Sequence, residues 1–396
     1  MNFIYFSPHF PRTNEKFCRQ LKERGVNVLG IGDAPYESLS EGLKQSLTEY
    51  YRVRNPENYD EVYRAAAFFA FKYGKIDWVE SNNEYWLGQD ARLRSDFNVP
   101  TGIHAEDVEK FKNKSAMKAF FKAANIPAPR LAKVTSYDET LAFIHEVGYP
   151  VIVKPDNGVG ACNTWRLNND SEFDYFFSTK PPVPYVTEEF IDGDIVSYDA
   201  ITDSHAHPLF ESMTEWPPSI ADIVTKELDL AYYVAAGVPE KLRRLGRTAA
   251  RTFGAARRFI HLEFFRLKKP RNGLGNVGDY VALEVNMRPA GGDTPDMMNY
   301  AHATDVYRIW ADMVAMDGRS LPASGQDHFC VYAGRRDKYA YRHSHDEIMQ
   351  RYGASMAQTG ENPPMSWPQM GNRFYMVHAP DEAAAREFIA FVQERI

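Results

Sequence analysis

The chain has only three cysteines among 396 residues, and it has no long apolar run. Cys18, Cys162 and Cys330 lie far apart and form neither a CxxC pair nor a zinc-binding spacing, so we expect reduced thiols. The longest apolar run, Ala65–Phe71, is much shorter than the ~20 residues that a membrane-spanning helix needs. The chain does not open on a cationic segment followed by a long apolar one, which predicts no signal peptide. These features predict a cytoplasmic protein that does not bind membranes.

A long basic segment is also missing. The chain has 46 lysines and arginines against 53 acidic residues, a net charge of −7. This balance argues against a nucleic-acid-binding protein, although one pocket can still oppose the overall sign and bind a charged substrate. Hydrophobic residues make up 44% and charged residues 25%, which excludes a largely disordered chain. At about 100–200 residues per domain, the length predicts two to four domains.

The first hundred residues alternate between short apolar runs and amphipathic segments. The first strand-to-helix turn lacks the GxGxxG pattern, so no dinucleotide fingerprint is present. Alternation of this kind with short connections is typical of a parallel sheet covered by helices on both faces. The expected strands are 3–6, 26–31 and 77–80, and the expected helices are 14–24 and 58–73.

The pattern changes near Asp107. One long helix is predicted over 107–124, followed by an extended segment at Ile126–Pro129, because a residue before proline avoids the helical region. Further strands and helices then follow in mixed order up to the end of the chain. The expected strands are 149–155, 185–191, 195–202, 259–267, 280–287, 329–333 and 373–378, and the expected helices are 137–147, 240–253, 304–316 and 381–395.

An apolar strand that ends in a lysine is the first motif with chemical potential. Lys154 closes the run Val151–Lys154, and a loop with Gly158 and Gly160 follows. Glycines let backbone N–H groups approach an anion closely, and a lysine side chain adds a mobile positive charge suited to phosphate. A β-hairpin with a surface lysine remains an equally good interpretation of this motif alone.

A second motif ends the strand predicted at 185–191. Two carboxylates, Glu188 and Glu189, precede the apolar pair Phe190 and Ile191 and an acidic glycine turn with Asp194. Backbone groups of such a segment can meet an adenine edge, and a carboxylate can bind ribose hydroxyls. A strand with one polar face followed by a turn explains the same residues without a ligand.

The third motif is the most specific. Glu284, Asn286 and Arg288 stand at every second position, so a strand points all three toward one face. Carboxylate and amide oxygens suit a hard cation such as Mg²⁺, and a guanidinium two residues on can stabilise a phosphoryl or acyl oxygen. An antiparallel neighbouring strand can bring Glu263 beside Glu284 as a second metal carboxylate. A solvent-facing strand with mixed charges is the alternative.

Taken in order, the three motifs resemble the ATP-grasp superfamily, which includes biotin carboxylase, carbamoyl-phosphate synthetase and carboxylate–amine ligases. The run from Asn113 to Phe120, with its two lysines, resembles the entry helix of that family. The resemblance covers roughly residues 75–320. One departure is the loop sequence Gly-Val-Gly-Ala-Cys-Asn, where many members of the family have more serine and glycine.

The resemblance implies a role for each matching residue. Glu188 is expected to take the adenine amino group, and Asp194 to bind the ribose. Arg288 is expected to steady an acyl phosphate and the later tetrahedral intermediate, as the catalytic residue. The nucleotide-binding residues are expected to be Lys114, Lys154, Gly158, Gly160, Glu188, Glu189, Phe190, Ile191 and Asp194, and the ligands of two Mg²⁺ ions, for which Mn²⁺ could substitute, to be Glu263, Glu284 and Asn286.

The expected fold is therefore a mixed α/β and α+β multidomain protein. A Rossmann-like domain, the pre-ATP-grasp domain, is expected over residues 1–105. A two-subdomain ATP-grasp fold is expected next, with a lid and phosphate loop at 106–187 and metal and catalytic residues at 188–325. A small C-terminal α+β unit is expected over 326–396.

The function implied is that of an ATP-dependent carboxylate–amine ligase, which forms an amide or peptide bond through an acyl phosphate. The partners expected are a small carboxylate, an amine and, as in many relatives, a second copy of the chain. One alternative is an enzyme of carboxylase or purine-pathway type that activates bicarbonate or formate. The other is a protein that binds ATP without catalysis.

Groups for the remaining substrates are less defined. The Gly291–Gly292 turn and the acidic residues after it could contact a carboxylate or an amine. The segment 211–223 is a candidate substrate loop, and Arg335 and Arg336 could close over a cleft. Glu84, which closes a strand of the first domain, could face a cleft, and structural capping explains it equally well.

Overall fold

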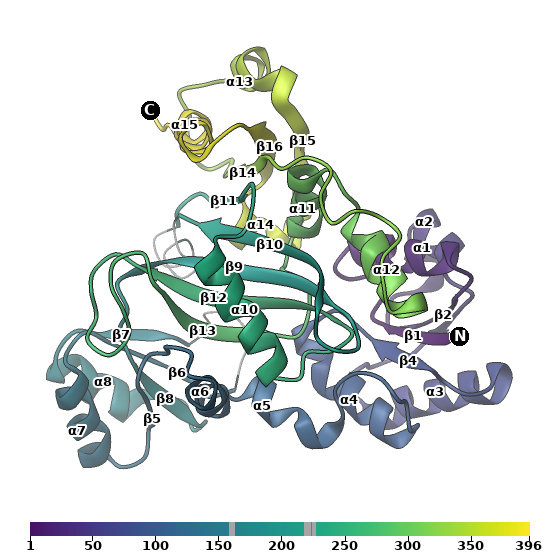
Figure 1. Ribbon diagram of the computed structural model, residues 1–396, viewed down its shortest axis with the longest axis horizontal. Coiled ribbons are helices and arrows are strands. Elements are labelled where there is room, and N and C mark those ends of the chain that lie inside the picture. Colours follow the sequence, from purple (N-terminus) through teal and green to yellow (C-terminus); the bar gives the residue numbers. More distant parts are fainter. Residues whose placement is uncertain (158–162, 218–222, 224–226) are drawn as a thin grey trace.

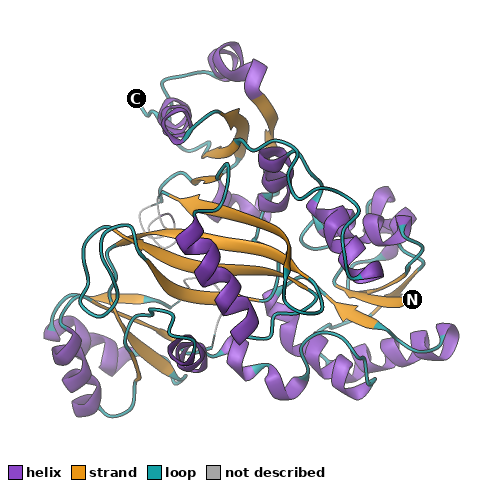
Figure 2. Cartoon of the chain, in the orientation of Figure 1, coloured by secondary structure: helices purple, strands orange, loops and turns teal. Residues whose placement is uncertain are grey.

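The computed structural model describes residues 1–157, 163–217, 223 and 227–396. Its described strands form three sheets, one parallel and two antiparallel, with helices packed on their faces (Figure 1). This arrangement confirms the predicted mixed α/β multidomain class. Figure 2 shows the large antiparallel sheet at the centre of the molecule, with a smaller sheet on either side.

The N-terminal sheet is parallel and has the order β3-β2-β1-β4. Its strands alternate in side-chain direction, so Phe3 and Tyr5 of β1 face one core cluster while Ile4 and Phe6 face another. Helices cover both faces, as predicted. The elements of this region are β1 (Asn2–Phe6), α1 (Asn14–Glu23), β2 (Asn27–Gly32), α2 (Glu41–Ser46), β3 (Glu49–Arg52), α3 (Tyr59–Tyr73), β4 (Trp78–Glu80), η2 (Glu84–Trp86) and α4 (Leu87–Asp96).

The single helix predicted over 107–124 is wrong, because the structure breaks it into two. Asn113 adopts an extended conformation, with φ −94° and ψ 118°, between α5 (Glu109–Lys112) and α6 (Lys114–Ala123). The break lets the backbone of Asn113 pair with Asn157 in an isolated bridge. The second helix therefore begins against the segment that follows the lysine-bearing strand.

A second sheet, antiparallel, has the order β5-β8-β6-β7. Two helices cover it, and their apolar side chains form a separate small core with those of the strands. The central strands β6 and β8 carry the first two predicted motifs. The elements are β5 (Leu131–Lys133), α7 (Tyr137–Val147), β6 (Val151–Pro155), β7 (Trp165–Leu167), α8 (Asp170–Thr179) and β8 (Tyr185–Glu189).

The central sheet is antiparallel and runs β13-β12-β9-β10-β11-β14-β16-β15. The third motif lies on its edge strand β13, beside β12. The strands contributed by the last seventy residues extend this sheet instead of forming one of their own. The elements are β9 (Gly193–Thr202), β10 (Pro208–Trp216), β11 (Ala231–Val234), α10 (Glu240–Thr252), β12 (Arg258–Leu267), β13 (Tyr280–Asn286), α11 (Thr294–His302), α12 (Val306–Met316), β14 (Phe329–Arg335), α13 (His345–Tyr352), β15 (Met356–Glu361), α14 (Trp367–Met370), β16 (Arg373–Ala379) and α15 (Glu382–Gln393).

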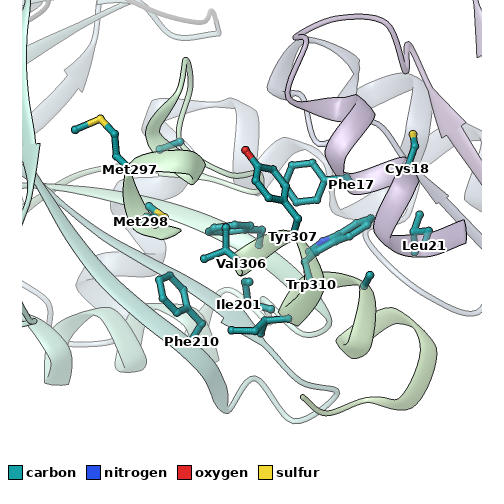
Figure 3. Packing of buried hydrophobic residues seen from close by; sticks show 14 of the residues in the cluster. Phe17, Cys18, Leu21, Ile201, Phe210, Met297, Met298, Val306, Tyr307 and Trp310 are labelled. Carbon is teal, nitrogen blue, oxygen red and sulfur yellow. The ribbon is translucent and has the colours of Figure 1, made fainter. Parts of the chain in front are cut away.

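One hydrophobic core joins the first domain to the central sheet. Trp310 of α12 is buried and packs edge-on against Phe17 of α1, with ring centroids 5.0 Å apart (Figure 3). The same tryptophan meets Phe3 at 5.8 Å, and Ile201 of β9 belongs to the same cluster. Helix α12 thus completes a face of the N-terminal sheet, which links the first domain firmly to the central one.

Helix α10 packs closely on the central sheet at Gly246. A methyl group built on Gly246 would overlap the ring of Tyr198, a buried residue of β9 whose hydroxyl donates to Glu211. Helix propensity alone favours alanine by about 1 kcal/mol. Because the overlap must displace a buried ring, we expect Gly246→Ala to lower the free energy of unfolding by about 1–3 kcal/mol. Urea denaturation measures it; a stabilised variant would contradict the packing argument.

Candidate active site

The start of α6 and the end of β6 are tied together by Asp156. Its backbone carbonyl accepts from the N–H of Lys114 at 2.9 Å, and its carboxylate accepts from the N–H of Ser115 at 2.8 Å. A carboxylate is stabilised at a helix N-terminus, where backbone N–H groups lack partners within the helix. Lys154 lies two residues before Asp156 on β6, and Lys114 is the first residue of α6. The contacts of Asp156 therefore bring the two lysine-bearing elements together.

A buried carboxylate lies between two lysines of this site. Glu188 of β8 is 2.5 Å from the Nζ of Lys154 and 2.7 Å from that of Lys118. Burial alone raises the pKa of this carboxyl, but the charges of Lys118 and Lys154 outweigh burial and lower the pKa to about 2. Glu188 therefore stays ionised and holds both ammonium groups inside the site.

Lys118 was not among the predicted site residues. Its Nζ also donates to the carbonyls of Ala282 and Leu283 on β13, at 3.2 and 3.3 Å, so it links α6, β8 and β13. The signal that could have found it is the i, i+4 spacing from Lys114, which puts both lysines on one face of the helix.

The predicted carboxylate pair is present. Glu263 and Glu284 stand directly opposite each other in the antiparallel ladder of β12 and β13. Burial and the charge of Glu263 raise the pKa of Glu284, as expected for like charges side by side. The Nζ of Lys114 lies 3.9 Å from Glu284, so a cation already partly offsets this negative charge.

The rest of the third motif lies at the end of β13. Asn286 is buried and pairs with His261 in the ladder, and Arg288 lies two residues beyond it. A guanidinium N–H of Arg288 donates to the Pro289 carbonyl at 2.7 Å. Glu84 of the first domain approaches the same place, and burial, opposed by the charge of Arg288, raises its pKa to about 7. Glu84 is buried near Arg288; that it faces a cleft stays a prediction.

A histidine contacts Glu263, one of the two paired carboxylates. His261 contacts Asp199 at 2.7 Å through Nδ1 and Glu263 at 3.2 Å through Nε2. Burial lowers the pKa of His261, but the charge of Asp199 prevails and raises it to about 9. The resulting imidazolium orients Glu263. Sequence reasoning missed Asp199, whose only signal was its place on a strand that pairs with β12.

The segment expected to hold adenine, residues 188–191, begins at the end of β8 and continues beyond it. Glu189 is on the face opposite Glu188, where its carboxylate binds Arg130 and Arg271. The guanidinium of Arg166 lies 4.5 Å from the ring centre of Phe190, and Ile191 is buried against β12 and β13. The side chains of Glu189 and Ile191 are thus engaged by protein, and the N–H of Glu189 donates to the Arg130 carbonyl at 2.9 Å. A base is left the remaining backbone groups of 189–191.

Asp194 is the second residue of β9. Its carboxylate is 2.5 Å from the Nζ of Lys268 and 3.6 Å from Arg266. It is therefore a paired side chain that would have to share its oxygens with a ribose.

Some sequence predictions fall outside the site or outside the described residues. Gly158 and Gly160 belong to the undescribed stretch 158–162. The candidate substrate loop over 211–223 is wrong at its start, because 211–216 belong to strand β10, and 218–222 lie outside the described residues. The idea that Arg335 and Arg336 close over a cleft is wrong. Both are buried and donate to backbone carbonyls, Arg335 to those of Val392 and His343 and Arg336 to that of Pro368, because a buried guanidinium must use its donors within the fold.

Within 1–157, 163–217, 223 and 227–396, no three His, Cys, Asp or Glu side chains gather into a closed metal site. Two carboxylates and an amide are nevertheless enough for Mg²⁺, which takes its remaining oxygens from water and substrate phosphates. In the same described part, none of the helices is long and apolar enough to cross a bilayer.

Residues 111–216, which include α6, β6 and β8, match the model of the ATP-grasp domain family. This finding confirms the resemblance that the motifs indicated.

Solved structures share this fold over nearly the whole chain. An L-amino acid ligase from Bacillus licheniformis is 16% identical, with a TM-score of 0.72, and the match covers 98% of this chain and 95% of that one. A phosphoribosylglycinamide synthetase from Anaerococcus prevotii is 13% identical, with a TM-score of 0.70 and coverage of 99% and 97%. The biotin carboxylase domain dimer of 2-oxoglutarate carboxylase from Hydrogenobacter thermophilus, a complex with MgADP, ADP and bicarbonate, is 15% identical, with a TM-score of 0.64 and coverage of 96% and 86%. At these identities the likeness establishes the fold.

Proposed function

We propose that the protein is an ATP-dependent carboxylate–amine ligase. It activates a carboxylate as an acyl phosphate, joins the acyl group to an amine, and releases ADP and phosphate. The observation that carries this proposal is the pair of carboxylates Glu263 and Glu284, which stand opposite each other near the end of β13 that precedes Arg288. Glu284 also lies 3.9 Å from the Nζ of Lys114. The ligase and the biotin carboxylase domain with the same fold support the reaction type.

Lys114 and Lys154 are proposed to bind the ATP phosphates, together with the loop that contains Gly158 and Gly160. Lys114 is buried and Lys154 is largely buried, and each lies beside a carboxylate, so their positive charges are held in place before a nucleotide arrives. Glu188 and the backbone of 189–191 are proposed to meet the adenine, and Asp194 the ribose. The described part of β6 and β8 lines this side of the site.

The donor set on β12 and β13 fits Mg²⁺. Two adjacent carboxylates offer the oxygen ligands that this ion prefers, and Asn286 adds a neutral oxygen. We propose that Glu263, Glu284 and Asn286 hold two Mg²⁺ ions, which Mn²⁺ could replace. Bound Mg²⁺ supplies positive charge that offsets the repulsion between the triphosphate and the substrate carboxylate.

The chain's own residues account for the rest of the chemistry. A carboxylate is a poor electrophile because its leaving group is an oxide, and phosphorylation provides a good one. Arg288 is proposed to stabilise negative charge on the acyl phosphate and on the tetrahedral intermediate. The acyl phosphate hydrolyses readily, so the small sheet with β6 and β8 is proposed as a lid that excludes water.

The metal assignment makes a prediction for Glu284→Gln. Glutamine keeps the shape but removes one charge from the pair, so Mg²⁺ is held less tightly. We expect the Mg²⁺ concentration for half-maximal turnover to rise about tenfold. Titration of Mg²⁺ at saturating ATP measures it, and Glu387→Gln, at an exposed carboxylate of α15 paired with Arg351, is the control that leaves the Mg²⁺ dependence unchanged. An unaltered Mg²⁺ dependence in Glu284→Gln would remove this carboxylate from the metal site.

The experiment that tests the function is a substrate screen. Amino acids and small carboxylates are supplied singly and in pairs with MgATP, and ADP and phosphate are measured, with mass spectrometry of the product. The proposal expects ADP release that depends on both a carboxylate and an amine, and a product of their summed mass less water. ADP release with bicarbonate or formate alone would favour the carboxylase-type alternative, and ATP binding without ADP would favour a non-catalytic protein.

We further propose a homodimer and the division into the units 1–105, 106–187, 188–325 and 326–396. The dimeric biotin carboxylase domain supports the first of these. Light scattering of the purified chain measures its mass in solution directly.

A further inference from the structure

Met287 lies between two residues of the proposed active site, Asn286 and Arg288. Strand β13 ends at Asn286, whose pairing with His261 is the last of the ladder with β12. The backbone N–H and C=O of Met287 are therefore beyond the sheet, and Met287 is only 1% exposed, so both groups need other partners.

Side chains supply both partners. The N–H of Met287 donates to Oε2 of Glu84 at 3.1 Å, across 203 residues of sequence. Its carbonyl accepts from Arg258 twice, at 2.8 Å from Nη2 and 3.3 Å from Nε. A guanidinium makes stronger hydrogen bonds than a neutral donor, and the carboxyl oxygen of Glu84 occupies the N–H, so the peptide is held from both sides.

The first domain also anchors the arginine of this pair. Nη2 of Arg258 contacts Oε2 of Glu80 at 2.8 Å, and the same oxygen lies 3.1 Å from Arg94. Arg94 is completely buried and donates to the carbonyls of Val79 and Ile103. Glu80 ends β4 and Glu84 begins η2, so both carboxylates come from one end of the parallel sheet.

We propose that Glu84 and Arg258, the latter through Glu80 and Arg94, are positioning residues that fix the Met287 backbone and thereby aim Asn286 and Arg288. We call these four side chains the Met287 clamp. Buried charges cost several kcal/mol each to desolvate, and apolar packing can join two domains without that cost. Here Glu84 and Arg258 both bind the backbone of Met287, which joins Asn286, a candidate metal ligand, to Arg288, the candidate catalytic residue. The inference rests on the proposed function of those two residues.

A second interdomain ion pair provides a contrast. Asp312 of α12 is buried and binds Arg24 of the first domain, but its other partner is Ser320, remote in sequence from β13. It joins the same two regions without contacting the Met287 segment. Asp312→Asn is therefore the matched control for a role that is only structural.

The test compares Glu84→Leu, Glu84→Gln and Asp312→Asn in the full chain. Glutamine keeps an acceptor oxygen for the Met287 N–H, whereas leucine removes it. We expect Glu84→Leu to speed deuterium exchange in a peptide spanning 284–290 and to lower kcat about tenfold, with KM for ATP unchanged. Glu84→Gln should remain close to wild type in both measurements, and Asp312→Asn should lower stability while leaving both unchanged.

The outcomes separate this inference from the proposed function. If no substrate pair releases ADP, the proposed function fails, while the exchange data and Mg²⁺-dependent ADP affinity still report on the clamp. Unchanged exchange in folded Glu84→Leu overturns the clamp. So does faster exchange with wild-type kcat and wild-type Mg²⁺-dependent ADP affinity, because the peptide would then be held without any consequence for the site. Equal losses in Glu84→Leu and Asp312→Asn would assign Glu84 a purely structural role.

Discussion

Arg288→Ala is expected to lower kcat by about 10²–10³-fold while the affinity for MgATP changes little. The guanidinium lies past the end of β13, beyond the carboxylate pair, and the lysines proposed to hold the phosphates are on α6 and β6. Its loss therefore removes charge stabilisation where negative charge develops on the acyl group, and it leaves the nucleotide contacts in place. Lysine at this position keeps the charge but loses the planar fork, so Arg288→Lys should recover only part of the rate.

The measurement combines steady-state turnover with calorimetric binding of a nonhydrolysable ATP analogue. Arg308→Ala is the control, since Arg308 is an arginine of α12 that donates to Ser320 and has no contact with the third motif. Loss of analogue binding in Arg288→Ala, with normal turnover per bound nucleotide, would show that Arg288 belongs to the nucleotide site. Its assignment to the acyl-transfer step would then be wrong.

The sequence predicted the parts of this site whose chemistry follows strand periodicity. Glu284, Asn286 and Arg288 were recognisable because alternate positions on a strand share a face, and the pairing of Glu263 with Glu284 followed from antiparallel neighbours. The alternation of apolar and amphipathic segments likewise predicted the parallel N-terminal sheet.

What escaped prediction depends on contacts between elements distant in the chain. Asp199 supports Glu263 only because β9 pairs with β12, and Glu84 reaches Met287 across 203 residues. The break at Asn113 was invisible because the residues around it favour helix, and the tertiary bridge to Asn157 overrides that preference. Local pattern does not encode such pairings.

The two lysines on Glu188 are expected to differ in what their loss does. Lys118 is held by Glu188 and by two carbonyls of β13, whereas the one partner of Lys154 found among the described residues is Glu188. To bind a phosphate, Lys154 must give up part of its pairing, and a buried carboxylate left with no cation is costly. Lys118 keeps Glu188 paired when Lys154 turns to the nucleotide.

Lys154→Met should therefore weaken ATP binding by about 10–100-fold, since it removes a charged contact to phosphate. Lys118→Met should weaken ATP binding by about tenfold for a different reason, because Lys154 then remains the sole counter-charge of Glu188 and competes with the phosphate for it. Neutralising the carboxylate should relieve that competition, so Lys118→Met with Glu188→Gln should bind the triphosphate better than Lys118→Met alone. Adenosine affinity, measured in parallel, corrects for any change in the base contacts of Glu188. If the double variant binds ATP no better than Lys118→Met after this correction, the two lysines act independently and Glu188 does not couple them.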